Sequence, residues 1–196
     1  MLIKWVRCRV TDASTFSRGQ EGWRPLTDVP GFLGQWGGWS EPGVAHVVAL
    51  WRSPDDHTAF LAGPHDRLAA AQTGTFDRID VRLFDRELDM GGPRDGAVVR
   101  LAHCHVRAGR EDHFVRAQSE VWTPGMTAAG MRGGVFGRNG SEFLVLSWWA
   151  SSEEHARYQA DAFPALRAAS QAVDDLSAIT GALVALEQSW TVPPAV

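Results

Sequence analysis

Hydrophobic and polar positions alternate in several short stretches of the chain, and this alternation predicts strands. In residues 2–10, Val6, Cys8 and Val10 alternate with more polar neighbours. A period of two is typical of a strand with one buried face. Further strands are predicted at four other places: a glycine-rich stretch at 32–39, an apolar stretch at 45–51, and closing stretches at 79–84 and 182–186.

Between these stretches the apolar period changes to that of a helix. In residues 14–26, Phe16, Gln20 and Trp23 recur at i, i+4 and i+7, which places them on one stripe of a helix. The sequence Ser-Pro-Asp-Asp beginning at Ser53 predicts a second helix start, with Ser as N-cap and Pro in the first turn.

The second half of the chain repeats the first. Cys8 corresponds to Cys104, and after a two-residue insertion the offset becomes 98 or 99. The matched pairs are Phe16 and Phe114, Gln20 and Gln118, Trp23 and Trp122, Trp51 and Trp149, Ser53 and Ser151, His57 and His155, and Phe60 and Tyr158. Each copy therefore has the order strand, helix, strand, strand, helix, strand.

This βαββαβ order is the ferredoxin-like arrangement, an antiparallel sheet with helices on one face. The other sheet face needs a cover, and two copies can cover each other. We therefore predict an α+β fold of two tandem ferredoxin-like repeats that form a fused, pseudo-dimeric α/β barrel. The repeats are expected at 1–85 and 97–192, joined by a linker at 86–96 that contains glycines and a proline.

Composition narrows the class of protein. The chain has 196 residues, 44% of them hydrophobic, and a net charge of −4, which is unlike a protein that binds nucleic acid through phosphate contacts. Its apolar runs are too short to span a bilayer, and charges interrupt the N-terminus too early for a signal peptide. Two cysteines form neither a disulfide framework nor a zinc module. We expect a cytoplasmic protein with no nucleic-acid or membrane partner.

Several segments resemble a known family. They are LIKWVRC at 2–8, GFLGQWGGW at 31–39, HD at 65–66, VWTPGM at 121–126, GMRGGVF at 130–136 and LEQSW at 186–190. They are similar to the YdbC-like family with the DUF4937 domain, within the dimeric α/β-barrel superfamily that includes the antibiotic-biosynthesis monooxygenases. The resemblance implies a fused barrel with a ligand pocket between sheet and helices in each repeat. It predicts no resident cofactor and leaves haem or flavin open.

The resemblance also implies which residues line the pockets. In the first repeat these are Phe16, Gln20, Trp23, Trp51, Phe60 and His65, and in the second Phe114, Gln118, Trp122, Trp149 and Tyr158. Trp36 and Trp39 occur only in the first repeat. They are interpreted either as the lip of a pocket for a planar ligand or as a docking edge for another chain.

Two residues are the candidates for catalysis. Gln20 lies on an apolar stripe, so its amide either orients a polar ligand atom or is satisfied by backbone. His65 corresponds to Phe163 and is therefore not demanded by the fold. It is interpreted as a general base, with a haem ligand or a locally bonded helix-start histidine as alternatives.

A separate polar face is predicted on the first strand of each repeat. His103 and His105 alternate, so both point to one side of the sheet, and Arg7 and Arg9 are their counterparts. This face is interpreted as a polar barrel interior or an anion pocket. No metal is predicted. Metal binding by His103 and His105 is the less favoured alternative, because the third ligand is suggested only by residue type, with His46, His113 and Glu142 as the candidates.

Three kinds of function follow. The first is a small-molecule oxygenase or oxidoreductase of the antibiotic-biosynthesis-monooxygenase-like type, acting on an aromatic or polycyclic substrate without a cofactor. The alternative is a protein that binds or senses a small hydrophobic ligand, or haem, without chemistry. Because the barrel is complete within one chain, we expect a monomer or a weak homodimer. The third hypothesis is an interaction protein that docks to another chain through Trp36 and Trp39.

Overall fold

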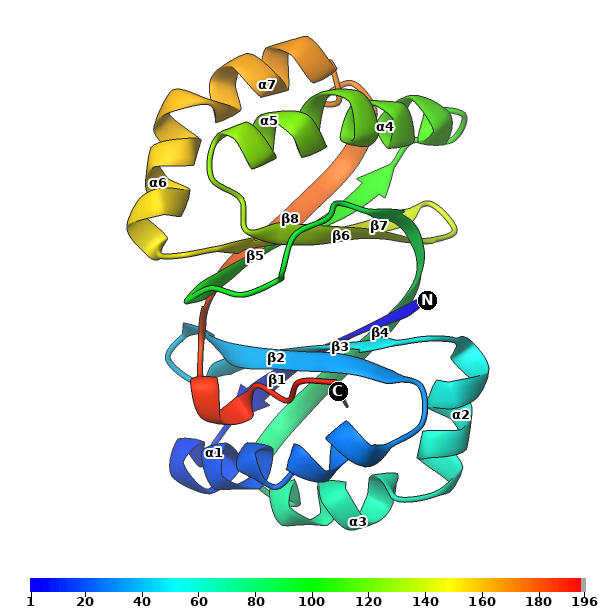
Figure 1. Cartoon of the computed structure of the whole chain (residues 1–196), viewed down its shortest axis with the longest axis vertical. Coiled ribbons are helices and arrows are strands. Elements are labelled where there is room, and N and C mark those ends of the chain that lie inside the picture. The colour runs from blue at the N-terminus through cyan, green and yellow to red at the C-terminus, as the bar shows by residue number, and fades with distance from the viewer. Residues whose placement is uncertain (195–196) are drawn as a thin grey trace. The chain divides into compact units, whose positions relative to one another are not determined.

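The computed structural model describes residues 1–194 and contains two compact units, one made of residues 1–85 with the segment from Leu186 onward, the other of residues 86–185 (Figure 1). The strands are β1 (Leu2–Val10), β2 (Phe32–Glu41), β3 (Val44–Trp51), β4 (Phe76–Asp89), β5 (Val98–Val106), β6 (Gly133–Asn139), β7 (Glu142–Trp149) and β8 (Leu176–Leu186). The helices are α1 (Ala13–Glu21), α2 (Pro54–Ala62), α3 (His65–Ala69), α4 (Glu111–Ala117), α5 (Thr123–Ala128), α6 (Ser152–Asp161) and α7 (Phe163–Ser170). Short 3-10 turns lie at Arg24–Asp28, Ala70–Gln72 and Gln188–Trp190.

The strands pair in the same pattern in both units. In the first, β1 pairs antiparallel with β3 and β4, and β2 pairs with β3; in the second, β5 pairs with β7 and β8, and β6 with β7. Even the registers correspond, since Cys8 pairs with Ala45 as Cys104 pairs with Phe143. The eight strands belong to a closed barrel, so the predicted fold class is confirmed.

The helices of each unit cover one face of its own sheet (Figure 1). Ser53 and Ser151 are N-caps as predicted, because their hydroxyls accept from the backbone N–H three residues later, at 3.1 and 3.2 Å. The strand predicted at 79–84 is longer than expected, since β4 runs from Phe76 to Asp89.

The first helix of each repeat ends differently from the prediction. The helix expected at 14–26 ends at Glu21, because Gly22 caps it and Pro25 has no N–H to continue it. In the second repeat the helix continues through a π-helical turn at Gln118–Trp122. The repeat offset changes from 98 to 99 between these two residues, so the π turn accommodates the inserted residue.

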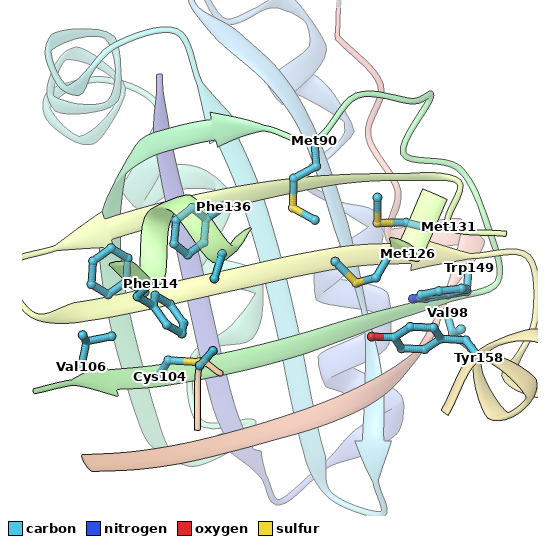
Figure 2. Close-up of a cluster of buried hydrophobic side chains, with 13 residues drawn as sticks. Met90, Val98, Cys104, Val106, Phe114, Met126, Met131, Phe136, Trp149 and Tyr158 are labelled. Atoms are coloured by element: carbon cyan, nitrogen blue, oxygen red, sulfur yellow. The ribbon is translucent and has the colours of Figure 1, made fainter. Parts of the chain in front are cut away.

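Aromatic side chains dominate the core of the second unit. Phe136 stacks on Phe143 at 5.3 Å between ring centroids, and Phe114 packs against both. Phe114 and Phe136 are labelled in Figure 2. Cys104 is a free, buried thiol in the same cluster. Burial raises its pKa to about 12, and that of the corresponding Cys8 to about 11, so both act as small apolar residues.

The last described segment of the chain completes the first unit. Val192 exchanges two backbone hydrogen bonds with Gln35, at 2.9 and 3.0 Å, which extends the pairing beyond β2. Trp190 is 1% exposed and packs edge-on against Trp39 and Phe16. Within residues 1–194, no helix has both the length and the apolar character needed to cross a membrane.

Candidate functional site

A cavity of about 540 Å³ lies between the sheet and the helices of the first unit. It brings together five of the residues expected there, namely Gln20, Trp23, Trp51, Phe60 and His65. Trp51 stacks on Phe60 at 4.9 Å and Trp23 lies 6.3 Å from Phe60, so three aromatic rings form one wall. We call this space the first pocket.

Lys4 lies at the sheet side of the first pocket. Successive residues of β1 face opposite ways, and Lys4, Val6 and Cys8 all line the pocket. Burial lowers the pKa of the Lys4 ammonium, because the charged form loses water there. An ammonium held in an aromatic cavity is a binding group for an anion.

The sequence prediction missed Lys4, although a signal was present. Cys8 and Cys104 are 96 residues apart, and the same offset aligns Lys4 with Arg100. Both cations face the pocket of their own unit. A positive charge at this position is therefore common to the two repeats.

Three polar atoms at the first pocket are buried without a hydrogen-bond partner among the described residues. They are Gln20 Oε1, Trp51 Nε1 and Gln72 Nε2. The amide of Gln72 is oriented by Trp23, whose Nε1 donates to Gln72 Oε1 at 3.1 Å. Most buried polar atoms in proteins are paired, and leaving one unpaired costs about 1–3 kcal/mol. Three at one cavity, two of them donors, fit an oxygen-bearing ligand.

The second repeat shows what would satisfy one of these donors. There Trp149 Nε1 donates to Ser147 Oγ at 3.0 Å. The position that corresponds to Ser147 is Ala49, which offers no acceptor to Trp51. The Trp149 N–H is therefore bonded within the second unit, whereas the corresponding Trp51 N–H of the first unit is available to another partner.

His65 lies at the edge of the first pocket, with 27% of its side chain exposed. Its Nδ1 is 2.8 Å from Asp66 Oδ1, and its ring meets Trp23 and Phe60 edge-on at 5.9 and 5.4 Å. A carboxylate on Nδ1 orients the imidazole and leaves Nε2 as the proton acceptor. The structure thus supplies a partner that the sequence analysis did not identify.

A second pocket of about 460 Å³ occupies the equivalent place in the second unit. Gln118, Trp122 and Tyr158 line it as expected, together with Phe114. Trp149 is not among its lining residues; it packs behind Tyr158, ring on ring at 4.7 Å (Figure 2).

The polar groups of the second pocket are more fully occupied than those of the first. Arg100 donates to the carbonyl of Ala182 at 3.3 Å, and Gln118 Nε2 lies 3.9 Å from the sulfur of Met90. Burial raises the pKa of Tyr158 to about 12, so its hydroxyl stays protonated.

Three expected residues lie away from the first pocket. Phe16 and Trp39 pack with Trp190, and neither lines the cavity. Trp36 lies over Gly34, where φ is +132° and a Cβ would come within 2.6 Å of the indole. These side chains contribute to the packing of β2.

His57 and His155 occupy corresponding positions in the two units. Both are buried, and their rings meet those of Trp51 and Trp149 edge-on at 5.5 Å. Burial lowers the pKa of His57 to about 4, and the positive charge of Lys4 contributes.

The predicted polar face lies on the side of each sheet opposite the helices. In the first unit, Arg9 pairs with Asp77 at 2.6 Å, and Arg7 is adjacent in register to His46. Burial and the Arg7 charge lower the pKa of His46 to about 4. In the second unit, His103 and His105 lie on this side, with ring centroids 4.7 Å apart.

Comparison with solved structures shows the same fold. A "putative monooxygenase" from Lactobacillus acidophilus NCFM matches with a TM-score of 0.80 and 15% identity, covering 99% of this chain and 96% of its own. An "anthrone oxidase-like protein" matches with a TM-score of 0.67 and 14% identity, covering 95% and 91%. LmHde, a heme-degrading enzyme from Listeria monocytogenes, matches with a TM-score of 0.52 and 8% identity, covering 94% and 99%. Identities this low establish the fold alone.

Sequence comparison goes further than fold. The model for the domain of unknown function DUF4937 matches residues 2–84. "Uncharacterized protein YdbC" of Bacillus subtilis (strain 168) is 32% identical over 95 residues, which is 44% of this chain and 80% of that protein. With the matching fold and the resemblance of its segments, the chain belongs to the YdbC-like DUF4937 family.

Proposed function

We propose that the first pocket binds a planar aromatic molecule that carries an acidic oxygen, and that the protein oxidises it with molecular oxygen. The observation that carries this proposal is the combination of one half-buried ammonium and three unpaired polar atoms in a single aromatic-walled cavity. Small-molecule sites typically have this character, with mostly apolar walls and a few convergent polar groups.

Each polar group has a place in this binding. In this proposal the Lys4 ammonium binds the charged oxygen of the ligand. The N–H groups of Trp51 and Gln72, whose nitrogens are buried in residues of the cavity wall, donate to it. A phenolate or enolate is stabilised by such donors, because they oppose charge in a cavity with little water. Gln20 Oε1 accepts from a hydroxyl elsewhere on the ring system. The aromatic side chains pack against the ligand faces and exclude water.

His65 is the general base of the proposed reaction. Its Nε2 removes a proton from an activated methylene of the bound aromatic, while Asp66 holds Nδ1–H and stabilises the imidazolium. The resulting anion is electron-rich and reacts with molecular oxygen without a cofactor. The methylene carbon loses both hydrogens and becomes a ketone carbon by bonding to one oxygen atom. The other oxygen atom leaves as water with those two hydrogens, so one dioxygen is reduced for each methylene oxidised.

The residues of this pocket fit an oxygenated anion better than haem, although a heme-degrading enzyme shares the fold. The Lys4 ammonium at the sheet side of the cavity pairs with an anionic oxygen and, in its charged form, offers no lone pair to iron. The proposed reaction therefore uses no step through haem.

The test measures binding and oxidation of a set of tricyclic aromatic ketones with an activated methylene, the anthrone class. Oxygen consumption and quinone absorbance report turnover, and calorimetry under nitrogen reports binding. We expect Lys4→Met to weaken binding at least tenfold, since it removes a charged partner worth about 1.5–3 kcal/mol. His65→Gln should lower turnover by about 10²-fold and leave binding intact.

Arg100→Met is the matched control, because it removes the corresponding cation from the second unit. It should leave binding and turnover unchanged. Tight binding without oxygen uptake would refute the oxygenase and favour the binding or sensing alternative. If no compound of the set binds, or if Lys4→Met and Arg100→Met lose the same affinity, the first pocket is not the site. Native mass spectrometry of the same samples reports whether the protein is the expected monomer or a weak homodimer.

A further inference from the structure

Three side chains of metal-binding type meet on the second sheet, on the face away from its helices. Arg100, Ala102 and Cys104 of β5 line the second pocket, so the alternating residues His103 and His105 point the other way. Glu142, the first residue of β7, is the direct pairing partner of His105. The topology thus places two imidazoles and one carboxylate at one spot.

The distances suit a single ion. His103 Nε2 lies 2.8 Å from Glu142 Oε2, and the ligand atoms of His103, His105 and Glu142 all lie within 4.8 Å of one another. Around a transition metal, ligand atoms about 2.0–2.2 Å from the ion stand roughly 3–3.5 Å apart. Rotation of the His105 and Glu142 side chains closes that difference, because both are only half-buried.

The fold itself does not demand these residues. The corresponding positions of the first repeat hold Arg7, Arg9 and Val44. The arginine at the position of His105 is paired with Asp77 instead. All three ligand types therefore occur together in one repeat and are all absent from the same positions in the other.

We propose that His103, His105 and Glu142 form a mononuclear site for a divalent first-row transition metal ion. Two imidazole nitrogens and one carboxylate oxygen suit zinc, cobalt or iron(II), and three protein ligands leave a coordination position open. The ion takes the place of the proton that His103 and Glu142 share at 2.8 Å. The site is separate from the first pocket and does not depend on the function proposed for it.

The test is titration of the metal-free protein with Co²⁺, followed by its visible d–d absorption, and displacement by Zn²⁺ in calorimetry. We expect one ion per chain in the wild type. Glu142→Gln and His105→Gln should each weaken binding at least tenfold, because loss of even an outer partner typically costs 10–100-fold.

His113→Gln is the control. His113 also contacts a carboxylate, Asp175 Oδ2 at 2.6 Å, but Arg110 occupies the other oxygen in place of a second imidazole. It should bind Co²⁺ as the wild type does. A double variant, His105→Arg with Glu142→Val, installs the residues of the first repeat and keeps the test valid if the single variants misfold. No saturable binding in the wild type, unchanged binding in the double variant, or equal loss in His113→Gln would overturn the proposal.

Discussion

Replacing Ala49 by serine should stabilise the protein. The substitution gives Trp51 the acceptor that Trp149 already has in Ser147, at 3.0 Å. The two surroundings correspond closely. Trp51 stacks on Phe60 at 4.9 Å and 28°, and Trp149 stacks on its aromatic neighbour at 4.7 Å and 27°. The new hydroxyl should therefore meet the indole N–H in nearly the same geometry.

The size of the effect follows from this comparison. A net intramolecular hydrogen bond contributes about 1 kcal/mol, which for a chain of this length raises Tm by about 2–4 °C. The reverse change, Ser147→Ala, leaves the Trp149 donor buried and unpaired, so it should cost about 1–3 kcal/mol. If a ligand oxygen uses Trp51 Nε1 in the first pocket, Ala49→Ser should also weaken ligand binding about fivefold.

Urea unfolding and calorimetry measure both variants. Ala49→Cys is the control, because it adds an atom of comparable volume with only weak hydrogen-bonding capacity. A gain in Ala49→Ser that exceeds the effect of Ala49→Cys supports the hydrogen bond. Equal effects of the two, or a loss of stability in Ala49→Ser, would refute the idea that the Trp51 N–H lacks a partner.

Three further predictions concern buried ionisable groups. Asp175 is fully buried and contacts Arg110 and His113, so replacing it by alanine should lower the free energy of unfolding by about 1.5–3 kcal/mol, as measured by urea unfolding at pH 7. Burial holds the pKa of His46 and His57 at about 4 against 6.5 when exposed, so the unfolded chain takes up protons first as the pH falls. The free energy of unfolding should therefore decrease between pH ~6.5 and ~4, by up to about 3 kcal/mol per histidine, and His57→Gln should remove its share of that slope. Cys8 and Cys104 should react with a disulfide reagent at pH 8 only after urea unfolds the protein, because burial raises both thiol pKa values; fast reaction of the native protein would contradict this.

The fold was largely predictable because the same pattern of elements occurs in both repeats of the sequence. Paired positions such as Trp51 and Trp149 occur at equal depth in equal elements, so one copy supports the assignment of the other. The site was less predictable. Alternation along β1 shows that Lys4 shares a face with Cys8, but not which face the helices cover. Gln72 lies in a short 3-10 turn with no periodic signal, although its amide is one of the buried groups at the pocket.

The packing of Trp39 was not predictable from the sequence, for a different reason. Sequence comparison treats each repeat as a continuous stretch, and Trp39 has no aromatic counterpart in the second. Its partner, Trp190, comes from the other end of the chain, after the eighth strand. Long-range packing of this kind leaves no local pattern to detect.

That distant partner has a consequence for how the protein is made. Residues 1–85 emerge from the ribosome long before Trp190 and Val192 are synthesised. Trp190 fills the core of the first unit, and Val192 pairs with Gln35 at the end of its sheet. The second unit consists of one uninterrupted stretch and can fold while synthesis continues. The half that emerges first is therefore the half that is completed last, and until then its unfilled core is open to chaperones and proteases.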